Sequence, residues 1–360
     1  MIFMGMRPTI ILGLESSCDE TAAALVADGR EVLSSVVASQ DKLHERYGGV
    51  VPEIAARAHI ENILPVLHEA LARVGVGRDR IDAVAVAHCP GLTAALLIAV
   101  TCAKTLAWVW QKPLIAIDHL HSHLQSVMLE EQGKEPNLFP AVALVVSGGH
   151  TSLYYGKNPL ELQLIGYTLD DAAGEAFDKT AHILKLPYPG GPALERLAQK
   201  GDPRAVDFPR TYLGKGSLNF SFSGVKTAVL YYCRGQNMLG KDRVPEMTEQ
   251  EKADIAASFQ AAIIDVLVDK TLLAAERFNA PTVFLGGGVA ANLSLRNQLI
   301  RRCQEQDRRL IAAARRYCTD NAAMVAGLAY YKLKAAQVAD LSLEPYPLSP
   351  DLAAINNRRR

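Results

Sequence analysis

Short apolar runs and longer segments with helical spacing follow one another along the first third of the chain. The predicted elements, in order, are strands at residues 9–16, 21–28 and 31–39, a helix at 52–74, a strand at 83–88, a helix at 93–110 and a strand at 113–119. Asp28 and Gly29 form a tight-turn signal between the second and third strands. Apolar residues in 52–74 recur on one stripe, but Pro65 inside this stretch predicts a kink or a break.

The rest of the chain repeats this order of elements. They are strands at 141–149, 151–156 and 162–169, helices at 172–185 and 251–278, a strand at 281–289, a helix at 294–305, a strand at 309–314 and a helix at 320–336. The duplication predicts an α/β fold of two related lobes around a cleft. We expect an N-terminal lobe at 7–118, completed by a C-terminal helix at 320–340, and a second lobe at 119–319. An insertion lies at 186–250, and the proline-containing tail at 341–360 is expected to be extended or disordered.

Charge is balanced over the whole chain, because Lys+Arg and Asp+Glu each total 38 in 360 residues. Contact with a nucleic acid would therefore need a local basic patch. Candidates are the arginine pairs at 301–302, 308–309 and 315–316 and the terminal arginines at 358–360. A solvated helix face and a frayed terminus are the alternative interpretation.

Several features indicate a cytoplasmic protein. The six cysteines contain no CxxC pair, which argues against a zinc finger or a redox motif and favours free thiols in a reducing compartment. The apolar N-terminus runs into Glu15 without a small-residue cleavage site, unlike a signal peptide. Lys104 interrupts the apolar run at 93–110, so a buried helix is favoured there over a membrane span.

Three loops after predicted strands are candidates for phosphate binding. They are ESSCDET at 15–21, SGGHT at 147–151 and GGGVAAN at 286–292. Glycine lets the backbone approach a ligand closely, and amides at a turn or helix start attract anions. One such loop alone is typical of an ordinary turn, but three at matching positions in a duplicated fold favour nucleotide binding. The chain lacks a P-loop, a dinucleotide-binding GxGxxG and a nucleophile elbow.

Three histidines stand close together in HLHSH, residues 119–123. In a helix His119 and His123 would share one face and could bind one metal ion; in a strand all three, including His121, would share a face. Asp320, which follows a predicted strand, could be the third ligand, or simply a helix N-cap. A metalloprotease of the HExxH type would need glutamate at position 120, where this chain has leucine.

The motifs together resemble a known family. They are, in order, LGLESSCDET, YGGVVPEIAARAH, HLHSH, LVVSGGHT, GEAFDK, YPGGP, FSFSGVK, GGGVAAN and TDNA. This set is similar to that of the tRNA threonylcarbamoyladenosine transferases, once taken for sialoglycoprotein endopeptidases, and it covers about residues 9–335. The resemblance implies the actin-like ATPase and sugar-kinase (ASKHA, RNase H-like) fold, which agrees with the duplicated order.

The resemblance also implies roles for particular residues. The expected metal ligands are His119, His123 and Asp320, with Fe²⁺ favoured and Zn²⁺ possible. The expected substrate and nucleotide contacts are Val145, Val146, Ser147, Gly148, Gly149, Asp178, Gly191 and Asn292. Further candidates for catalysis near the cleft are Glu15, His150 and Lys226. Taken without the family, Asp178 reads as an ordinary surface carboxylate.

One departure from the family lies between the two histidine ligands. The family commonly has Glu-Gly there, and this chain has His121-Ser122. The tail after residue 341 departs as well. Since neighbours of the ligands tune a metal site, the metal preference is left open.

The reaction implied by the resemblance is transfer of the threonylcarbamoyl group from threonylcarbamoyl-adenylate to N6 of an adenosine in tRNA. The acceptor is the adenosine 3′ of the anticodon in tRNAs that read codons beginning with A, and AMP is released. The implied partners are tRNA and bacterial-type proteins, a TsaB-like paralogue and a TsaE-like ATPase. A small-molecule kinase and a non-catalytic scaffold paralogue are the alternatives, and neither would need the two histidines and the aspartate.

Overall fold

The computed structural model describes residues 7–130, 137–235 and 241–358, and the chain forms two compact units in it. The first contains the chain up to His44, Val50–Pro136 and the residues from Asp320 onwards; the second contains Glu45–Gly49 and Asn137–Thr319. The boundaries differ from the expected lobes at Glu45–Gly49, which belongs to the second unit, and at the start of the second lobe. Helix α4 (His119–Gln125), which we expected to open the second lobe, belongs to the first unit because it follows β5 directly and packs on α10.

A five-stranded sheet forms the centre of the first unit, in the order β3-β2-β1-β4-β5. The strands are β1 (Ile10–Glu15), β2 (Glu20–Ala27), β3 (Glu31–Ser39), β4 (Ala83–Cys89) and β5 (Leu114–Asp118). Strands β1, β2 and β3 pair antiparallel, while β4 and β5 run parallel to β1. Short helix α1 (Asp41–His44) follows β3.

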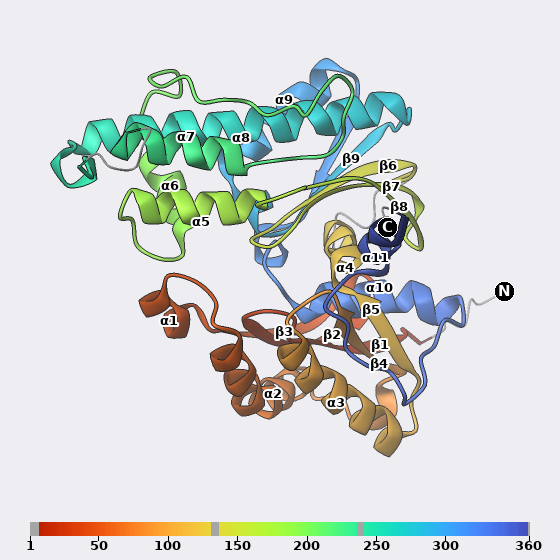
Figure 1. The fold of residues 1–360 in the computed structure, drawn as a ribbon. Coiled ribbons are helices and arrows are strands. Elements are labelled where there is room, and N and C mark those ends of the chain that lie inside the picture. Colours follow the sequence, from red (N-terminus) through yellow and green to blue (C-terminus); the bar gives the residue numbers. More distant parts are fainter. Residues whose placement is uncertain (1–6, 131–136, 236–240, 359–360) are drawn as a thin grey trace. The chain divides into compact units, whose positions relative to one another are not determined.

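Helices cover both faces of this sheet, as Figure 1 shows. Leu12 and Leu14 of β1 are buried in the core with residues of α2 (Pro52–Val74) and α3 (Thr93–Trp110). Between them, Gly13 points to the opposite face, where α10 (Ala322–Lys334) packs. This alternation is the period-two pattern of a strand buried on both sides.

The second unit repeats the topology, with the sheet order β10-β9-β6-β7-β8. Its strands are β6 (Ala141–Val146), β7 (Thr151–Asn158), β8 (Glu161–Tyr167), β9 (Thr282–Gly286) and β10 (Arg309–Ala312). Its helices are α5 (Ala173–Ile183), α6 (Gly190–Ala198), α7 (Ser223–Arg234), α8 (Glu249–Arg277) and α9 (Leu293–Glu305). An antiparallel three-stranded meander followed by two parallel strands occurs in both units, so the duplication predicted from element order is confirmed.

Two expectations about individual segments need correction. Helix α2 runs without a break through Pro65, whose side chain lies on the exposed face of the helix. The tail, expected to be extended or disordered, has no helix or strand at 341–349 but is held there by a hydrogen bond from the Tyr346 amide to the His88 carbonyl, and Pro350–Arg358 forms helix α11. The terminal arginines 359 and 360 lie outside the described residues.

Helix α3 is buried on one side only. Within the described residues it is the one helix long and apolar enough to cross a membrane, and 33% of its residues are buried. Its inner side packs on the sheet, and its outer side presents Leu97 and Trp108 to solvent. The expectation of a buried helix therefore holds for its inner side alone.

Candidate active site

Helix α4 begins where strand β5 ends, and Asp118 marks the junction. The Asp118 carboxylate accepts hydrogen bonds from the amides of Leu120 (2.8 Å) and His121 (3.2 Å), which is the arrangement of a helix N-cap. Because the segment is helical, His119 and His123 lie one turn apart on the same face. The alternative of an extended segment with three histidines on one face is wrong.

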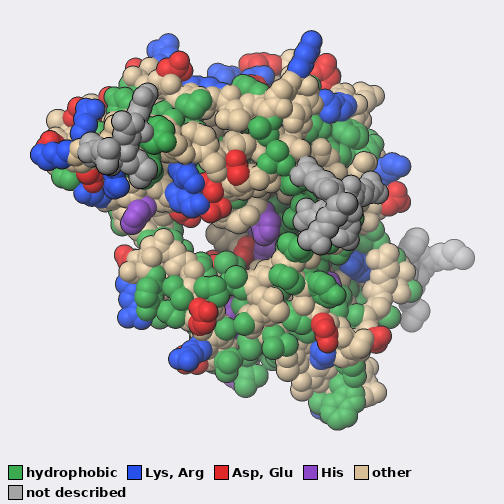
Figure 2. Space-filling model, viewed as in Figure 1, with side chains coloured by type: hydrophobic (Ala, Val, Ile, Leu, Met, Phe, Trp, Pro, Cys, Tyr) green, Lys and Arg blue, Asp and Glu red, His purple; other side chains and the backbone are tan. Residues whose placement is uncertain are grey.

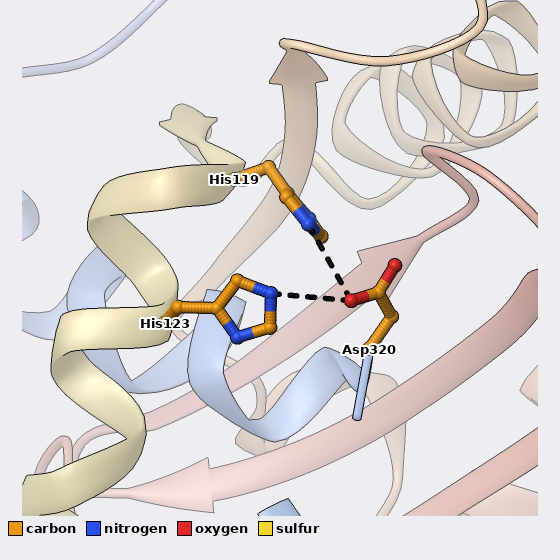
Figure 3. A group of neighbouring side chains, drawn as sticks. All are labelled: His119, His123 and Asp320. Atoms are coloured by element: carbon orange, nitrogen blue, oxygen red, sulfur yellow. Dashed lines mark ion pairs between the residues drawn. The ribbon is translucent and has the colours of Figure 1, made fainter. Parts of the chain in front are cut away.

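Asp320 approaches these histidines from the start of helix α10. The helix is capped by Asn321, whose side chain accepts a hydrogen bond from the Met324 amide at 3.0 Å. The alternative interpretation of Asp320 as the N-cap is therefore wrong. Its carboxylate points to the two imidazoles (Figure 3).

The three side chains form a compact group, and both histidines are buried. Oδ1 of Asp320 lies 3.2 Å from Nε2 of His123 and 3.5 Å from Nε2 of His119. Two ligands bound about 2.0–2.1 Å from one tetrahedral ion stand roughly 3.3 Å apart, so these separations suit a shared metal. Among the described residues, Nδ1 of His123 makes no hydrogen bond, and Nε2 meets the Asp320 carboxylate as an ion pair without hydrogen-bond geometry. Burying an imidazole nitrogen without a hydrogen bond costs free energy, unless the nitrogen binds a metal or another ligand.

Glu15, at the end of β1, holds the other side of the His119 ring. Its Oε2 lies 3.0 Å from Nδ1 of His119, and its Oε1 accepts a 2.6 Å hydrogen bond from the Ser17 amide. A carboxylate bound to Nδ1–H leaves Nε2 free to face a metal. Burial alone would lower the pKa of His119, but the carboxylates of Asp320 and Glu15 outweigh it and raise the pKa to about 9.

Two further acids lie where the loop after β1 meets β2, Asp19 in the loop and Glu20 as the first residue of the strand. Burial, followed by the charges of Asp320 and Asp19, holds the pKa of Glu20 well above its ordinary value. Burial also raises the pKa of Asp19, against the hydrogen bonds from Glu20 and Cys18 that lower it. Ionisation of these acids beside Asp320 is therefore disfavoured, and a bound cation would relieve the repulsion between the carboxylates.

In the second unit, the predicted loop after β6 is a closed turn. Val145 and Val146 are buried within β6, so their side chains face the core. The Ser147 amide donates to the His150 carbonyl (2.8 Å), and the His150 amide donates to Oγ of Ser147 (3.2 Å). Gly148 and Gly149 are exposed at its tip.

Helix α5 packs directly under this turn. A Cβ at Gly174 would lie 2.5 Å from the Ser147 carbonyl oxygen, so only glycine permits this approach. The Gly174 amide donates to the same oxygen at 3.2 Å. The turn at Ser147–Gly149 is thus held in place from below, while its tip remains open to solvent.

Asp178 on α5 holds the start of helix α6. Its Oδ1 accepts a 2.9 Å hydrogen bond from the Gly191 amide, so the structure brings these two predicted residues together. Beside them lies a cavity of about 390 Å³, whose lining includes Tyr47, His182 and Tyr188. Aromatic and imidazole rings next to a carboxylate suit a nucleoside, although no motif in the chain indicated the cavity.

Asn292 and Lys226 have partners within the protein. Oδ1 of Asn292 caps helix α9 at the Leu295 amide (3.0 Å), and Nδ2 donates to Gln260 (2.8 Å). Lys226 pairs with Asp171, which Lys179 also contacts at 2.9 Å. Burial opposes the charged form of Asp171, but the two lysines prevail and lower its pKa. Sequence reasoning missed Asp171, for which no motif gave a signal.

Comparisons with known proteins agree with the motifs. A family described as tRNA N6-adenosine threonylcarbamoyltransferase matches residues 31–327. A protein of that description from Moorella thermoacetica is 50% identical over 342 residues, covering 95% of this chain and 97% of the relative. Another, from Symbiobacterium thermophilum, is 50% identical over 343 residues with the same two coverages.

A similar solved structure shares the fold at low sequence identity. HypF of T. kodakarensis has a TM-score of 0.57 and 16% identity, covering 92% of this chain and 50% of HypF. The actin-like α/β fold class expected from the motifs is confirmed.

Proposed function

The chain belongs to the tRNA N6-adenosine threonylcarbamoyltransferase family and is an enzyme of tRNA modification, and we propose that its transfer reaction depends on a divalent metal held by His119, His123 and Asp320. The observation that carries this proposal is the convergence of three ligand atoms, all within 4.8 Å of one another, from two elements far apart in sequence. Either a kinase or a non-catalytic scaffold of this fold would leave that group without a use.

Two imidazoles and one carboxylate suit Fe²⁺ or Zn²⁺, and of these we favour Fe²⁺. Such a metal supplies Lewis-acid chemistry when bound, polarising phosphate and carbamoyl oxygens. Glu15 keeps the Nδ1 proton of His119 and so fixes the tautomer that presents Nε2. Asp118 holds helix α4 at its N-terminus and thereby sets the position of both histidines.

We propose that the donor is threonylcarbamoyl-adenylate and that the second unit binds its adenylate part. The Gly148 and Gly149 amides lie at the open tip of a turn that the Ser147 amide closes, where they can donate hydrogen bonds to phosphate oxygens and stabilise developing negative charge. Asp178 and Gly191 flank the cavity that would take the nucleoside. Val145, Val146 and Asn292 would support the site from within the fold.

The chemical step is attack of the adenosine N6 amine on the carbamoyl carbon of the donor. A new C–N bond forms, the bond from that carbon to the phosphate oxygen breaks, AMP leaves, and the amine loses a proton. The exocyclic amine is a weak nucleophile, so most of the acceleration must come from positioning and from the activated donor. The acceptor adenosine, next to the anticodon, lies in a single-stranded loop from which a base can be turned outward.

Incubation with threonylcarbamoyl-adenylate and unmodified tRNA, with and without partner proteins, tests this function directly. The expected product is threonylcarbamoyl-adenosine in tRNA together with AMP. ATP-dependent phosphorylation of a small alcohol would instead support the kinase alternative. Absence of product in every combination would refute the proposal.

Replacing Asp178 with alanine is expected to raise the KM for threonylcarbamoyl-adenylate about 10–100-fold. The reason is the loss of a charged hydrogen-bond acceptor, which contributes about 1.5–3 kcal/mol. Steady-state kinetics would measure it. Asp207, fully exposed in the same unit, provides the matched control Asp207→Ala, which should leave KM unchanged. An equal KM in both variants would contradict a role for Asp178 in donor binding.

We also propose that a TsaB-like paralogue docks on the outer face of helices α2 and α3. Large apolar side chains are exposed there, namely Ile60, Leu64, Leu97, Trp108 and Val109. Figure 2 shows apolar side chains gathered over this part of the first unit. Exposed apolar area on two packed helices is typical of an interface with another protein. A TsaE-like ATPase would bind elsewhere in the assembly.

The substitution Leu97→Glu should weaken binding of the TsaB-like paralogue at least about tenfold, because it places a charge in an apolar interface. Isothermal titration calorimetry with the purified paralogue would measure the loss. Leu169, similarly exposed but in the second unit, supplies the control Leu169→Glu. Unchanged binding in Leu97→Glu, or self-association of the chain through this face, would count against the proposal.

A further inference from the structure

His121 points away from the two proposed ligands and contacts the C-terminal segment. Its Nε2 lies 2.9 Å from Oδ2 of Asp351, a residue 230 positions away in the sequence. Both side chains are less than a third exposed. The side chain midway between the two proposed histidine ligands thus pairs with the C-terminal segment of the chain.

A second contact joins the same segment to the start of helix α4. Oγ of Ser349, a fully buried residue, donates a 2.6 Å hydrogen bond to Oδ2 of Asp118. The other oxygen of Asp118 caps helix α4. One carboxylate therefore links the C-terminal segment to the turn that sets the direction of the helix.

The segment reaches these contacts along a defined path. The Ala339 amide donates to the Leu114 carbonyl on β5 at 2.8 Å, and the Tyr346 amide donates to the His88 carbonyl on β4, also at 2.8 Å. Lys104 on α3 donates to the Leu343 carbonyl at 3.1 Å. In Figure 1 the chain from α10 to α11, drawn in dark blue, passes over the strand ends and finishes beside α4.

Helix α4 has seven residues, too few to hold a helical conformation by itself. Its position must come from contacts at its ends and sides. Asp118 and α10 supply two of these, and the C-terminal segment supplies the third at His121, midway between His119 and His123. A rotation of so short a helix would move both Nε2 atoms relative to Asp320.

We propose that residues 339–354, called the clasp here, hold helix α4 in place. Within the clasp, Asp351 and Ser349 are positioning residues for the metal ligands His119 and His123. The inference rests on the proposed metal site. It assigns His121 a role as the anchor of the clasp. Neither Asp351 nor Ser349 contacts the ligands, so both act through helix α4.

The test measures metal binding and helix mobility separately. Zn²⁺ is titrated into the full chain in competition with a chromophoric chelator, and hydrogen exchange of residues 119–125 is followed in the metal-free protein. Asp351→Ala is expected to weaken Zn²⁺ binding about tenfold, as the loss of a residue that supports metal ligands without binding the metal commonly does. It should also speed hydrogen exchange in α4. Ser349→Ala should act in the same direction. The control is Asp79→Ala, which removes an exposed carboxylate of the first unit that lies outside residues 339–354.

A double-mutant cycle identifies the contact. His121→Ala and Asp351→Ala together should weaken Zn²⁺ binding no more than either change alone. Asp351→Asn, which keeps an acceptor oxygen, should restore most of the affinity, and this rescue separates positioning from a general loss of folding. Wild-type affinity in both Asp351→Ala and Ser349→Ala, with or without faster exchange, would overturn the clasp. Failure of the wild-type chain to bind Zn²⁺ or Fe²⁺ would instead overturn the metal site itself.

Discussion

His123→Ala is expected to abolish metal binding and to reduce threonylcarbamoyl transfer more than about 100-fold. This loss exceeds the one expected when a residue that only hydrogen-bonds to a metal ligand is removed. His123 is fully buried, and its ring nitrogens make no hydrogen bonds among the described residues, so its contribution is to the ligand group. The same change at His119 or Asp320 should have a similar effect, because each residue supplies one of three ligands. Elemental analysis of the purified variants and single-turnover assays with tRNA would measure both quantities.

The matched control is His68→Ala, which removes an exposed imidazole from helix α2 of the same unit. It should bind metal and modify tRNA as the wild type does. Urea unfolding of the metal-free proteins would exclude a general loss of stability. Full metal content and activity in His123→Ala would contradict the proposed centre.

Alanine in place of Gly13 is expected to destabilise the first unit by about 1–3 kcal/mol and to weaken metal binding as well. Its Cβ would lie 2.4 Å from the Ala322 carbonyl oxygen and 2.9 Å from the Ala326 amide nitrogen, both backbone atoms of α10. The helix must therefore move away, and overpacking of this kind costs about 1–3 kcal/mol. Since Asp320 comes just before α10, the shift would carry its carboxylate away from the histidines. Urea unfolding and Zn²⁺ titration would measure the two effects.

Gly77→Ala is the control for this substitution. A Cβ at Gly77 meets no atom within 4 Å, and the residue lies in the same unit. We expect its stability and metal affinity to match the wild type. If Gly13→Ala lowered stability yet bound Zn²⁺ normally, the position of α10 would not govern the metal ligand.

The sequence predicted the elements well where their hydrophobic period was strong. An element that is buried on one or both faces has a regular spacing of apolar residues, and this spacing is visible within a short stretch of sequence. The strands, helix α2 and the repeated order of elements were predicted in this way. Pro65 gave a false signal of a break, because its ring lies on the exposed face of a helix held by packing at its other side. The proline content of the tail suggested an extended or disordered segment, but composition does not show that the tail would pack against other parts of the chain.

For the candidate site, the pairing of His119 with His123 could be predicted from the chain alone, because a helix places residues four apart on one face. The remaining features of the site depend on how distant segments pack. The tertiary structure separated Asp320 from the capping role, which Asn321 takes, and it placed Glu15 behind His119. It also joined His121 to Asp351. The physical reason is that spacing within one element fixes local geometry, whereas contacts between distant segments arise only when sheets and helices pack together.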